Sequence, residues 1–190
     1  MKLNAKIFIP SLLFGLLFSS QSHAVAAEFG VSYSYQKKSF SATNFYQSDS
    51  KSATASVSLI EQLALEFSYT ESFYESQEAD VNSTRVVQQK SQITGADLIY
   101  VLTDRKTMIQ PYLKAGVAYI QKKKQIRYLN ADVIDIPTKD GMAPSYGAGV
   151  KVKLTENFAI TLGYDVWNTP LDDGTKTDDT AFKAGLKWTP

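Results

Sequence analysis

Nine charged residues stand on the polar positions of segments in which polar and apolar residues alternate, and they are the side chains best placed to do chemistry. A pair of carboxylates can exchange protons with a substrate, and a line of mixed charges can carry ions. Here the acids are spread over four segments, and opposite charges that neutralise each other are the form in which buried charge is tolerated. We therefore interpret the set as a structural charge network: Glu28, Glu66, Asp97, Lys114, Lys151, Lys153, Asp165, Lys183 and Lys187.

Thiol and imidazole chemistry depend on residues that this chain nearly lacks. The 190-residue sequence has no cysteine and one histidine, His23. That histidine lies in a segment typical of a secretory signal peptide, with two early lysines, an apolar run over residues 7–18 and small residues at 24–26. The run is too short to span a bilayer comfortably as a helix. We therefore expect cleavage after Ala24 or Ala26 rather than a membrane anchor.

Removal of residues 1–26 leaves one domain, residues 27–190, with neither histidine nor cysteine. Ser-His-Asp catalysis, Cys-His catalysis and histidine-bound zinc are then excluded. A formal net charge of +1 gives no field that would attract nucleic acid. We expect no enzymatic activity, no cofactor, no metal site and no nucleic-acid partner.

Period-two alternation of polar and apolar residues dominates the rest of the chain. Tyrosine, phenylalanine, valine and threonine, which favour strands, recur in these stretches. No later stretch is long and apolar enough for a transmembrane helix. The pattern predicts eight strands: Phe29–Tyr35, Ser52–Leu59, Leu63–Thr70, Gly95–Leu102, Pro111–Tyr119, Gly147–Leu154, Phe158–Val166 and Phe182–Trp188.

The links between these strands alternate in length. Three are short polar turns, at residues 60–62, 103–107 and 155–157. Four are long and polar, at about residues 36–51, 71–92, 121–143 and 167–180. An even number of strands with short turns at one end and long loops at the other is typical of outer-membrane barrels. The predicted fold class is all-β: an eight-stranded antiparallel up-and-down transmembrane β-barrel after a cleaved signal peptide.

The alternation alone does not say whether the apolar face points outward to lipid or inward to the core of a soluble, lipocalin-like barrel. The polar faces carry mostly small residues, which suit the narrow lumen of eight strands. None of the apolar positions in the predicted strands is charged, and a charge on the lipid face is costly. Aromatic residues also mark the strand ends, as in the girdles at the two membrane interfaces. These are Tyr35, Tyr69, Tyr119 and Tyr164 towards the long links, and Phe29, Tyr100, Phe158 and Trp188 towards the short turns.

Two glycine-containing stretches carry a family likeness. Residues 110–119 contain Pro111, Tyr112, Gly116 and Tyr119 in a P-Y-x-x-x-G-x-x-Y pattern. The stretches Tyr146–Val150 and Leu154–Phe158 read as a strand, a turn and the start of the next strand. With these motifs, the mature chain resembles the small outer-membrane barrels of the OmpA/OmpX type.

This resemblance implies a place in the outer membrane of a Gram-negative bacterium, with both termini in the periplasm. It also implies a lumen filled by ion pairs, contact with outer-membrane lipid and lipopolysaccharide, and insertion by the barrel assembly machinery. Barrels of this family often end on an aromatic residue that the machinery reads. This chain ends Leu186–Pro190, so Trp188 would have to serve that role from two residues inside.

The long links hold the candidates for contact with a partner. Aromatic residues beside positive charge suit contacts with proteins, anionic glycans or lipopolysaccharide phosphates. The alternative is that these side chains only pack the loops or extend the strands. The candidates are Phe40, Phe45, Tyr46, Lys122, Lys123, Lys124 and Arg127.

The functional hypothesis is a structural or adhesive role carried by the four long loops. A small channel for ions or hydrophobic solutes, as in OmpW-like barrels, is the alternative, and the charged lumen argues against it. A barrel enzyme and a soluble periplasmic binder are further competitors. One pairing follows from the turn near residues 105 and 106: a regular hairpin there would place Asp97 opposite Lys114.

Overall fold

The structure is a computed structural model, and it describes residues 26–41, 44–80, 83–128, 133–170 and 176–190. The predicted signal peptide, residues 1–26, lies outside these ranges except for Ala26, so it stays a prediction. Across the described ranges there is no helix of the length and apolar character needed to cross a membrane.

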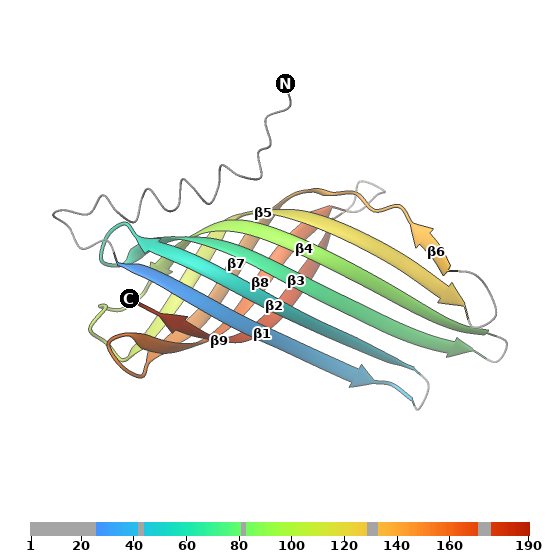
Figure 1. The fold of residues 1–190 in the computed structure, drawn as a ribbon, viewed down its shortest axis with the longest axis horizontal. Coiled ribbons are helices and arrows are strands. Elements are labelled where there is room, and N and C mark those ends of the chain that lie inside the picture. The colour runs from blue at the N-terminus through green and yellow to red at the C-terminus, as the bar shows by residue number, and fades with distance from the viewer. Residues whose placement is uncertain (1–25, 42–43, 81–82, 129–132, 171–175) are drawn as a thin grey trace, which may run out of the picture.

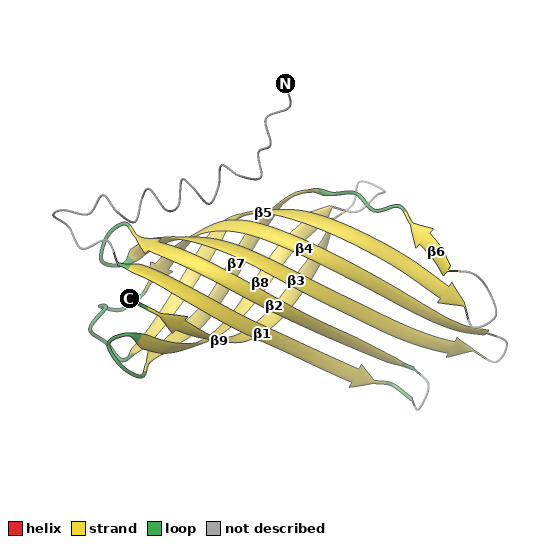
Figure 2. Cartoon of the chain, in the orientation of Figure 1, coloured by secondary structure: helices red, strands yellow, loops and turns green. Residues whose placement is uncertain are grey.

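Strands account for most of the described residues, and short connections join them (Figure 2). Nine strands are present within the described ranges. They are β1 (Ala27–Ser39), β2 (Phe45–Ser58), β3 (Leu63–Asp80), β4 (Ser83–Val101), β5 (Ile109–Tyr128), β6 (Val133–Ile136), β7 (Gly141–Lys153), β8 (Phe158–Pro170) and β9 (Lys176–Trp188).

All of these strands except the four-residue β6 form one closed antiparallel barrel. Each long strand pairs with the next in the chain, with β5 pairing β7, and β1 pairs β9 to close the ring. The prediction of an all-β, eight-stranded, up-and-down barrel is confirmed. β6 is a short addition that pairs with β5 between Lys124 and Arg127.

The two faces of the wall differ as predicted. Large apolar side chains point outward, with Val31 63%, Leu113 51% and Phe182 63% exposed. Inward positions carry small or polar residues, and Asp97 among them is only 3% exposed. Seven of the eight predicted girdle residues are exposed on the outer face: Tyr35, Tyr69, Tyr119, Tyr164, Tyr100, Phe158 and Trp188. The eighth, Phe29, is half-buried, and its ring centre lies 6.1 Å from that of Trp188. The apolar face is therefore the outer face.

The prediction of four long loops was wrong about their conformation. Most of these residues continue the strands: β3 and β4 pair with each other as far as Asp80 and Ser83, and β5 runs on to Tyr128. Both faces of these extensions are largely polar, because they lie beyond the apolar belt. Hydrophobic alternation, the signal used to find strands, is therefore absent from them.

The wall is uneven in height. Figure 1 shows β1–β5 reaching farther to one side than β7, β8 and β9. We call that side the long-hairpin end, and the side with the turns after β2, β4 and β7 the short-turn end. The β1–β9 pairing stops at Tyr33↔Ala184, although β1 continues to Ser39 along β2. From this pair towards the long-hairpin end, β1 and β9 each have one edge without a paired strand in the described part of the chain.

Candidate functional site

Inward-facing charges gather in the middle of the barrel, on strands that face one another across the lumen. The carboxylates come from β1, β3, β4 and β8, and the lysines from β5, β7 and β9. They share one interior because every second residue of a strand points to the same face. The strand pattern alone therefore concentrates charges that lie far apart in the sequence.

Lys114 of β5 lies at the centre of this set. Its ammonium Nζ is 2.9 Å from Asp165 Oδ1, 3.7 Å from Glu66 Oε1 and 3.9 Å from Asp97 Oδ2. The Lys114 side chain is 9% exposed, and the three carboxylate side chains are 4–6% exposed. One ammonium group thus neutralises carboxylates from three other strands.

The other lysines extend the network in both directions. Lys183 Nζ is 3.0 Å from Asp165 Oδ2, on the side towards the long-hairpin end. Towards the short-turn end, Lys187 Nζ is 2.7 Å from Glu66 Oε2 and 3.8 Å from Glu28 Oε2. Lys151 Nζ lies 2.8 Å from Glu28 Oε1 and completes a balanced set. The balanced set, which we call the charge network, consists of Glu28, Glu66, Asp97, Asp165, Lys114, Lys151, Lys183 and Lys187.

Lys153, the ninth charged residue, lies apart from this network. Its Nζ donates to the backbone carbonyl of Arg105. Arg105 was not among the sequence candidates, yet its guanidinium donates to the carbonyls of Glu61 at 2.6 Å and Ile60 at 3.1 Å. The side chain thereby ties the β4–β5 turn to the β2–β3 turn at the short-turn end. A lone arginine in a turn gives no sequence signal for such a cross-turn contact.

The register of β4 and β5 differs from the prediction. Asp97 is opposite Gly116, and Lys114 is opposite Ile99, so the two charges are displaced by two residues. The prediction assumed a symmetric hairpin, whereas the connection from Leu102 to Met108 sets another register. Both side chains nevertheless point inward, and Asp97 also accepts a hydrogen bond from Ser145 Oγ.

Small residues make room for the long inward side chains. A Cβ atom at Gly147 would lie 2.7 Å from Lys114 Cε and 2.7 Å from Asp165 Oδ1. A Cβ atom at Gly149 would lie 2.5 Å from the hydroxyl of Tyr112, another inward residue that the sequence reading did not single out. Gly147 thus makes room for side chains of β5 and β8, and Gly149 for Tyr112 of β5 and for the Leu162 carbonyl of β8, 2.5 Å from the same Cβ position.

The charge network fills most of the lumen. The cavity beside Lys114 holds about 40 Å³, and the one beside Arg105 about 30 Å³. One water molecule takes roughly 30 Å³ of liquid volume, so neither cavity admits a larger solute. The described residues also include no group of three side chains that could hold a metal ion. The arrangement is suited to bracing the barrel.

An apolar layer covers the network on the side of the long-hairpin end. Its buried members, which we call the septum, are Ile93, Ala118, Ile120, Ala143 and Trp167. Lys183 Nζ lies 4.8 Å from the centre of the Trp167 ring, so the network ends in a cation–π contact. The septum lies between the charge network and the space between the strand extensions on the side of β4, β5, β7 and β8, whereas on the side of β3 Lys183 Nζ donates to Thr70 Oγ1 at 3.2 Å.

The predicted aromatic contact residues lie on the β1–β2 hairpin. Phe40 is 66% exposed near the tip, and Lys38 Nζ is 5.2 Å from its ring centre. Phe45 has Lys37 Nζ at 5.3 Å in the same way. Tyr46 instead faces inward and stacks on Tyr74 of β3, with ring centres 6.0 Å apart. Phe40 is therefore fully available to a partner, Phe45 is half-buried on the outside of the hairpin, and Tyr46 lines the interior.

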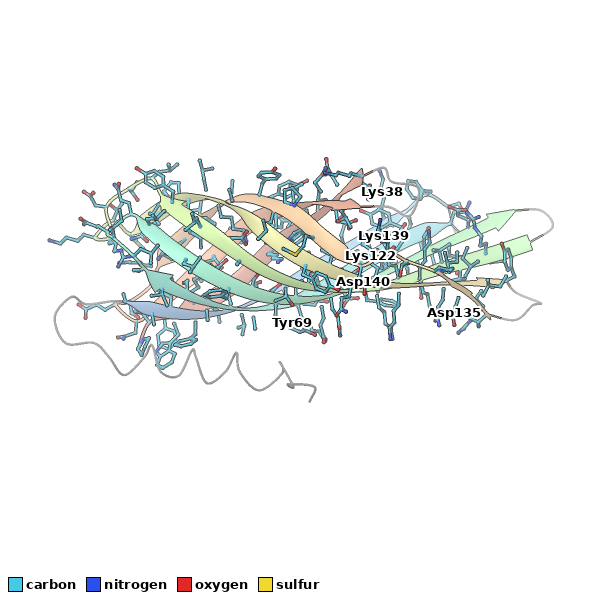
Figure 3. The ribbon with its side chains drawn as sticks, turned by 90° about the horizontal axis from the view of Figure 1, so that it is seen from above. Lys38, Tyr69, Lys122, Asp135, Lys139 and Asp140 are labelled. Atoms are coloured by element: carbon cyan, nitrogen blue, oxygen red, sulfur yellow. The ribbon has the colours of Figure 1, made fainter. Side chains whose placement is uncertain are left out.

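The predicted basic stretch does not form one patch. Lys122, Lys123, Lys124 and Arg127 belong to β5, so successive side chains point to opposite faces. Lys123 and Arg127 are exposed, whereas the Lys122 side chain is 7% exposed and its Nζ lies 2.8 Å from Asp179 Oδ2 of β9. Figure 3 shows Lys122 beside Asp140, whose Oδ1 accepts from the Lys122 backbone N–H at 3.1 Å.

The match to a known family agrees with this architecture. The model of the outer membrane protein beta-barrel domain matches residues 11–189. The chain belongs to this family. Its place is therefore the outer membrane of a Gram-negative bacterium, and its outward apolar belt faces lipid.

Solved structures of other outer-membrane barrels share the fold. Neisserial surface protein A (NspA) is 17% identical, with a TM-score of 0.60 over 87% of this chain and 97% of that one. OprG from Pseudomonas aeruginosa is 10% identical, with a TM-score of 0.61 over the same shares. Ail, the attachment invasion locus protein of Yersinia pestis, is 13% identical, with a TM-score of 0.50 over 86% of this chain and 99% of that one. No curated protein sequence matches this chain.

Proposed function

We propose that this barrel acts at the bacterial surface, through the hairpins that continue beyond its membrane-spanning wall. The observation that carries the proposal is the length of these strands. β5 alone continues from Tyr119 to Tyr128, roughly 30 Å of strand at about 3.4 Å per residue. A barrel that only spans the membrane does not require this extension. The polar outer face and the tips of the extended hairpins are therefore the parts available for contact with another surface.

The proposal fixes an orientation. The long-hairpin end faces the outside of the cell, and both termini and the short turns face the periplasm. Residues 1–26 serve as the signal peptide, and the barrel assembly machinery inserts residues 27–190, reading Trp188 near the end of β9. Lipid and lipopolysaccharide surround the outward apolar belt. No catalytic step is part of this function.

Conduction through the lumen is the weaker candidate. The charge network and the septum lie in series between the two ends, and the cavities beside Lys114 and Arg105 are about the size of one water molecule. An ion path would require several buried pairs to separate together. We therefore expect no steady conductance from the protein in planar bilayers.

The β1–β2 hairpin offers a direct test. Phe40 is exposed and Phe45 is half-buried, and each has a lysine beside its ring, the kind of surface that anchors contacts with proteins. Cells that produce the protein should adhere to one another, to host cells or to matrix proteins more than cells with an empty vector. The double variant F40S/F45S should lose that gain.

The matched control is L59S/I60S, which removes two exposed apolar side chains from the turn at the opposite end (53% and 65% exposed). It should leave adherence at the level of the unaltered protein. Adherence that is equal for the unaltered protein and F40S/F45S, with both inserted in the membrane, would contradict the role of this hairpin. The same conclusion follows if the unaltered protein gives no gain over the empty vector.

A further inference from the structure

A second space in the barrel lies on the other side of the septum, between the strand extensions. We call this cavity of about 210 Å³ the cup. Its wall comes from β1–β4 on one side and from β8 and β9 on the other, and Trp167 and Ile93 form its floor. At roughly 30 Å³ per water, the cup is several times larger than a single-water site and fits a small organic ring.

Hydroxyl groups dominate the lining. Ser34, Ser48, Ser50, Ser72 and Ser91 all point into the barrel and border the cup. A hydroxyl both donates and accepts hydrogen bonds, so this lining matches a ligand that also does both at many positions. An apolar ligand would bury these groups without partners, at about 1–3 kcal/mol for each group left unsatisfied.

One of these hydroxyls is already buried without a partner. Ser50 is 4% exposed, and its Oγ has no hydrogen-bond partner among the described residues. Buried polar groups are nearly always hydrogen-bonded in native proteins. Ser52, its inward neighbour on β2, shows the ordinary case, since its Oγ is 2.6 Å from Thr70 Oγ1. Because Ser50 also borders the cup, rotation of its side chain would let this hydroxyl bond a ligand there.

Aromatic side chains also line the cup and offer flat apolar faces to a ligand. The stacked pair Tyr46–Tyr74 borders the cup, and Trp167 borders it from the floor. Aromatic side chains combine a flat apolar face with a polar group at the edge. Such a face packs against the C–H face of a sugar ring, while neighbouring hydroxyls bond to the sugar's hydroxyls.

The charge of the lining favours a neutral ligand. Among the described residues that border the cup there is no lysine or arginine to hold an anion. The carboxylate there, Asp179, is already engaged, since its Oδ2 accepts from Lys122 Nζ at 2.8 Å and from Thr169 Oγ1 at 2.7 Å. The cup therefore has no free ionic group for a charged ligand.

One side of the cup is formed by the parts of β1 and β9 that do not pair with each other. Ser34 and Gln36 of β1 and Thr180 and Ala181 of β9 line the cup, and all lie above the last pair, Tyr33↔Ala184. Within the described residues, no strand pairs with these two edges beyond Tyr33↔Ala184. From the lining, the unpartnered Ser50 hydroxyl and the aromatic faces, we propose that the cup binds one neutral sugar residue of a glycan.

Tryptophan fluorescence provides the test. The chain has two tryptophans, and Trp188 lies on the outer face near the short-turn end. In the variant W188F, Trp167 is the only tryptophan, and it lies at the floor of the cup. Titration of this protein in detergent with glucose, galactose, mannose and N-acetylglucosamine should give a saturable change in emission for at least one sugar at millimolar concentrations.

Two variants assign that change to the cup. S50L fills it and should weaken binding by roughly tenfold or more, which corresponds to about 1.4 kcal/mol. Q89A removes a lining amide without adding bulk, and should weaken binding even if S50L folds poorly. The matched control is Q92A on the same strand, because Gln92 is exposed on the outer face. Q92A should bind sugar like the parent.

Several results would overturn the proposal. These are no saturable change with any of the four sugars, a change that survives unaltered in both S50L and Q89A, or a response to sulfate but to no sugar. A response in the parent opens a second comparison, between core oligosaccharide from lipopolysaccharide and free host-type oligosaccharides such as lactose. Tighter binding of either one supports sugar binding in the cup and identifies the source of the sugar. The hairpin variant F40S/F45S leaves the cup lining unaltered, so failure of the proposed surface role would not remove sugar binding.

Discussion

The charged middle of the lumen and the cup are built from the same inward positions of the same strands, yet they are filled in opposite ways. In the middle, lysines and carboxylates reach across the barrel, and every member of the charge network has an opposite charge within 4 Å. In the cup, serines replace the long side chains, about 210 Å³ stays open, and Ser50 Oγ has no partner among the described residues. Inward-facing polar side chains therefore play two roles: the long charged ones brace the wall, and the short serines leave open space in the cup.

Loss of Lys114 should have the largest effect on stability. The substitution K114M leaves Glu66, Asp97 and Asp165 buried with one cation fewer, and breaking a buried pair by removing one partner costs about 3–5 kcal/mol. We expect a loss of that size in the free energy of unfolding, measured by urea titration in detergent. The control K123M removes an exposed lysine from the outer face of the same strand, and should change stability by less than about 0.5 kcal/mol. Equal effects of the two variants would show that the network does not brace the barrel.

A bulky residue at Gly147 should have the next largest effect. In G147V the new Cβ would lie 2.7 Å from Lys114 Cε, and overpacking of this kind costs about 1–3 kcal/mol. The same valine at the neighbouring Ala148, which points outward, should be nearly neutral. The comparison is made by thermal unfolding, followed by the shift of the folded band in gels. If G147V is as stable as A148V, the middle of the lumen is more loosely filled than its contacts indicate.

Removal of Lys122 should have a smaller effect, because its pair lies at the border of the cup. Lys122 is 7% exposed and Asp179 36% exposed in this 2.8 Å contact, and hydrogen bonds to charged groups contribute about 1.5–3 kcal/mol when buried. We expect K122M to cost about 1 kcal/mol in urea unfolding. A cost equal to that of K114M would contradict the distinction between the two regions.

The exposed pair on the β3–β4 hairpin should matter least. Arg85 Nη2 lies 2.5 Å from Glu78 Oε2, but the side chains are 43% and 60% exposed, and exposed pairs contribute about 0.2–1 kcal/mol. R85M should therefore lower the free energy of unfolding only slightly, and the small loss should shrink further in high salt. A loss above about 2 kcal/mol would mean that the strand extensions, like the middle of the barrel, depend on ion pairs.

Alternation made the membrane part of the barrel predictable from sequence, because each strand there has one apolar and one polar face. The eight strands, the outward direction of residues such as Val31 and Leu113, and the inward direction of Lys114 and Asp165 follow from that pattern. Beyond Tyr119 the pattern disappears, so the sequence predicts a loop where the strand continues from Gln121 to Tyr128, and one patch where its lysines point to opposite faces. β6 was missed for a similar reason, since four residues are too few to show a period.

Contacts that depend on register or on several strands were not predictable. Asp97 and Lys114 do form an ion pair at 3.9 Å, but their predicted position directly opposite each other was wrong by two residues, because the length of an irregular turn fixes the register. The cup depends on where the β1–β9 pairing stops and on the position of Trp167 relative to strands far away in the chain. Serines such as Ser50 and Ser72 gave no signal of their own, because small residues suit any narrow lumen.

Cysteine accessibility on intact cells tests the central claim most directly, since the chain has no native cysteine. Ser72 borders the cup, and Ser68, four residues earlier on the same inward face of β3, borders the cavity beside Lys114. An impermeant maleimide should label S72C rapidly and leave S68C unlabelled, with E156C in the short β7–β8 turn also silent. Equal labelling of S68C and S72C would show an open lumen, and labelling of E156C with a silent S72C would show a reversed barrel. Either result would contradict a barrel that is plugged in the membrane and open to the outside through its cup.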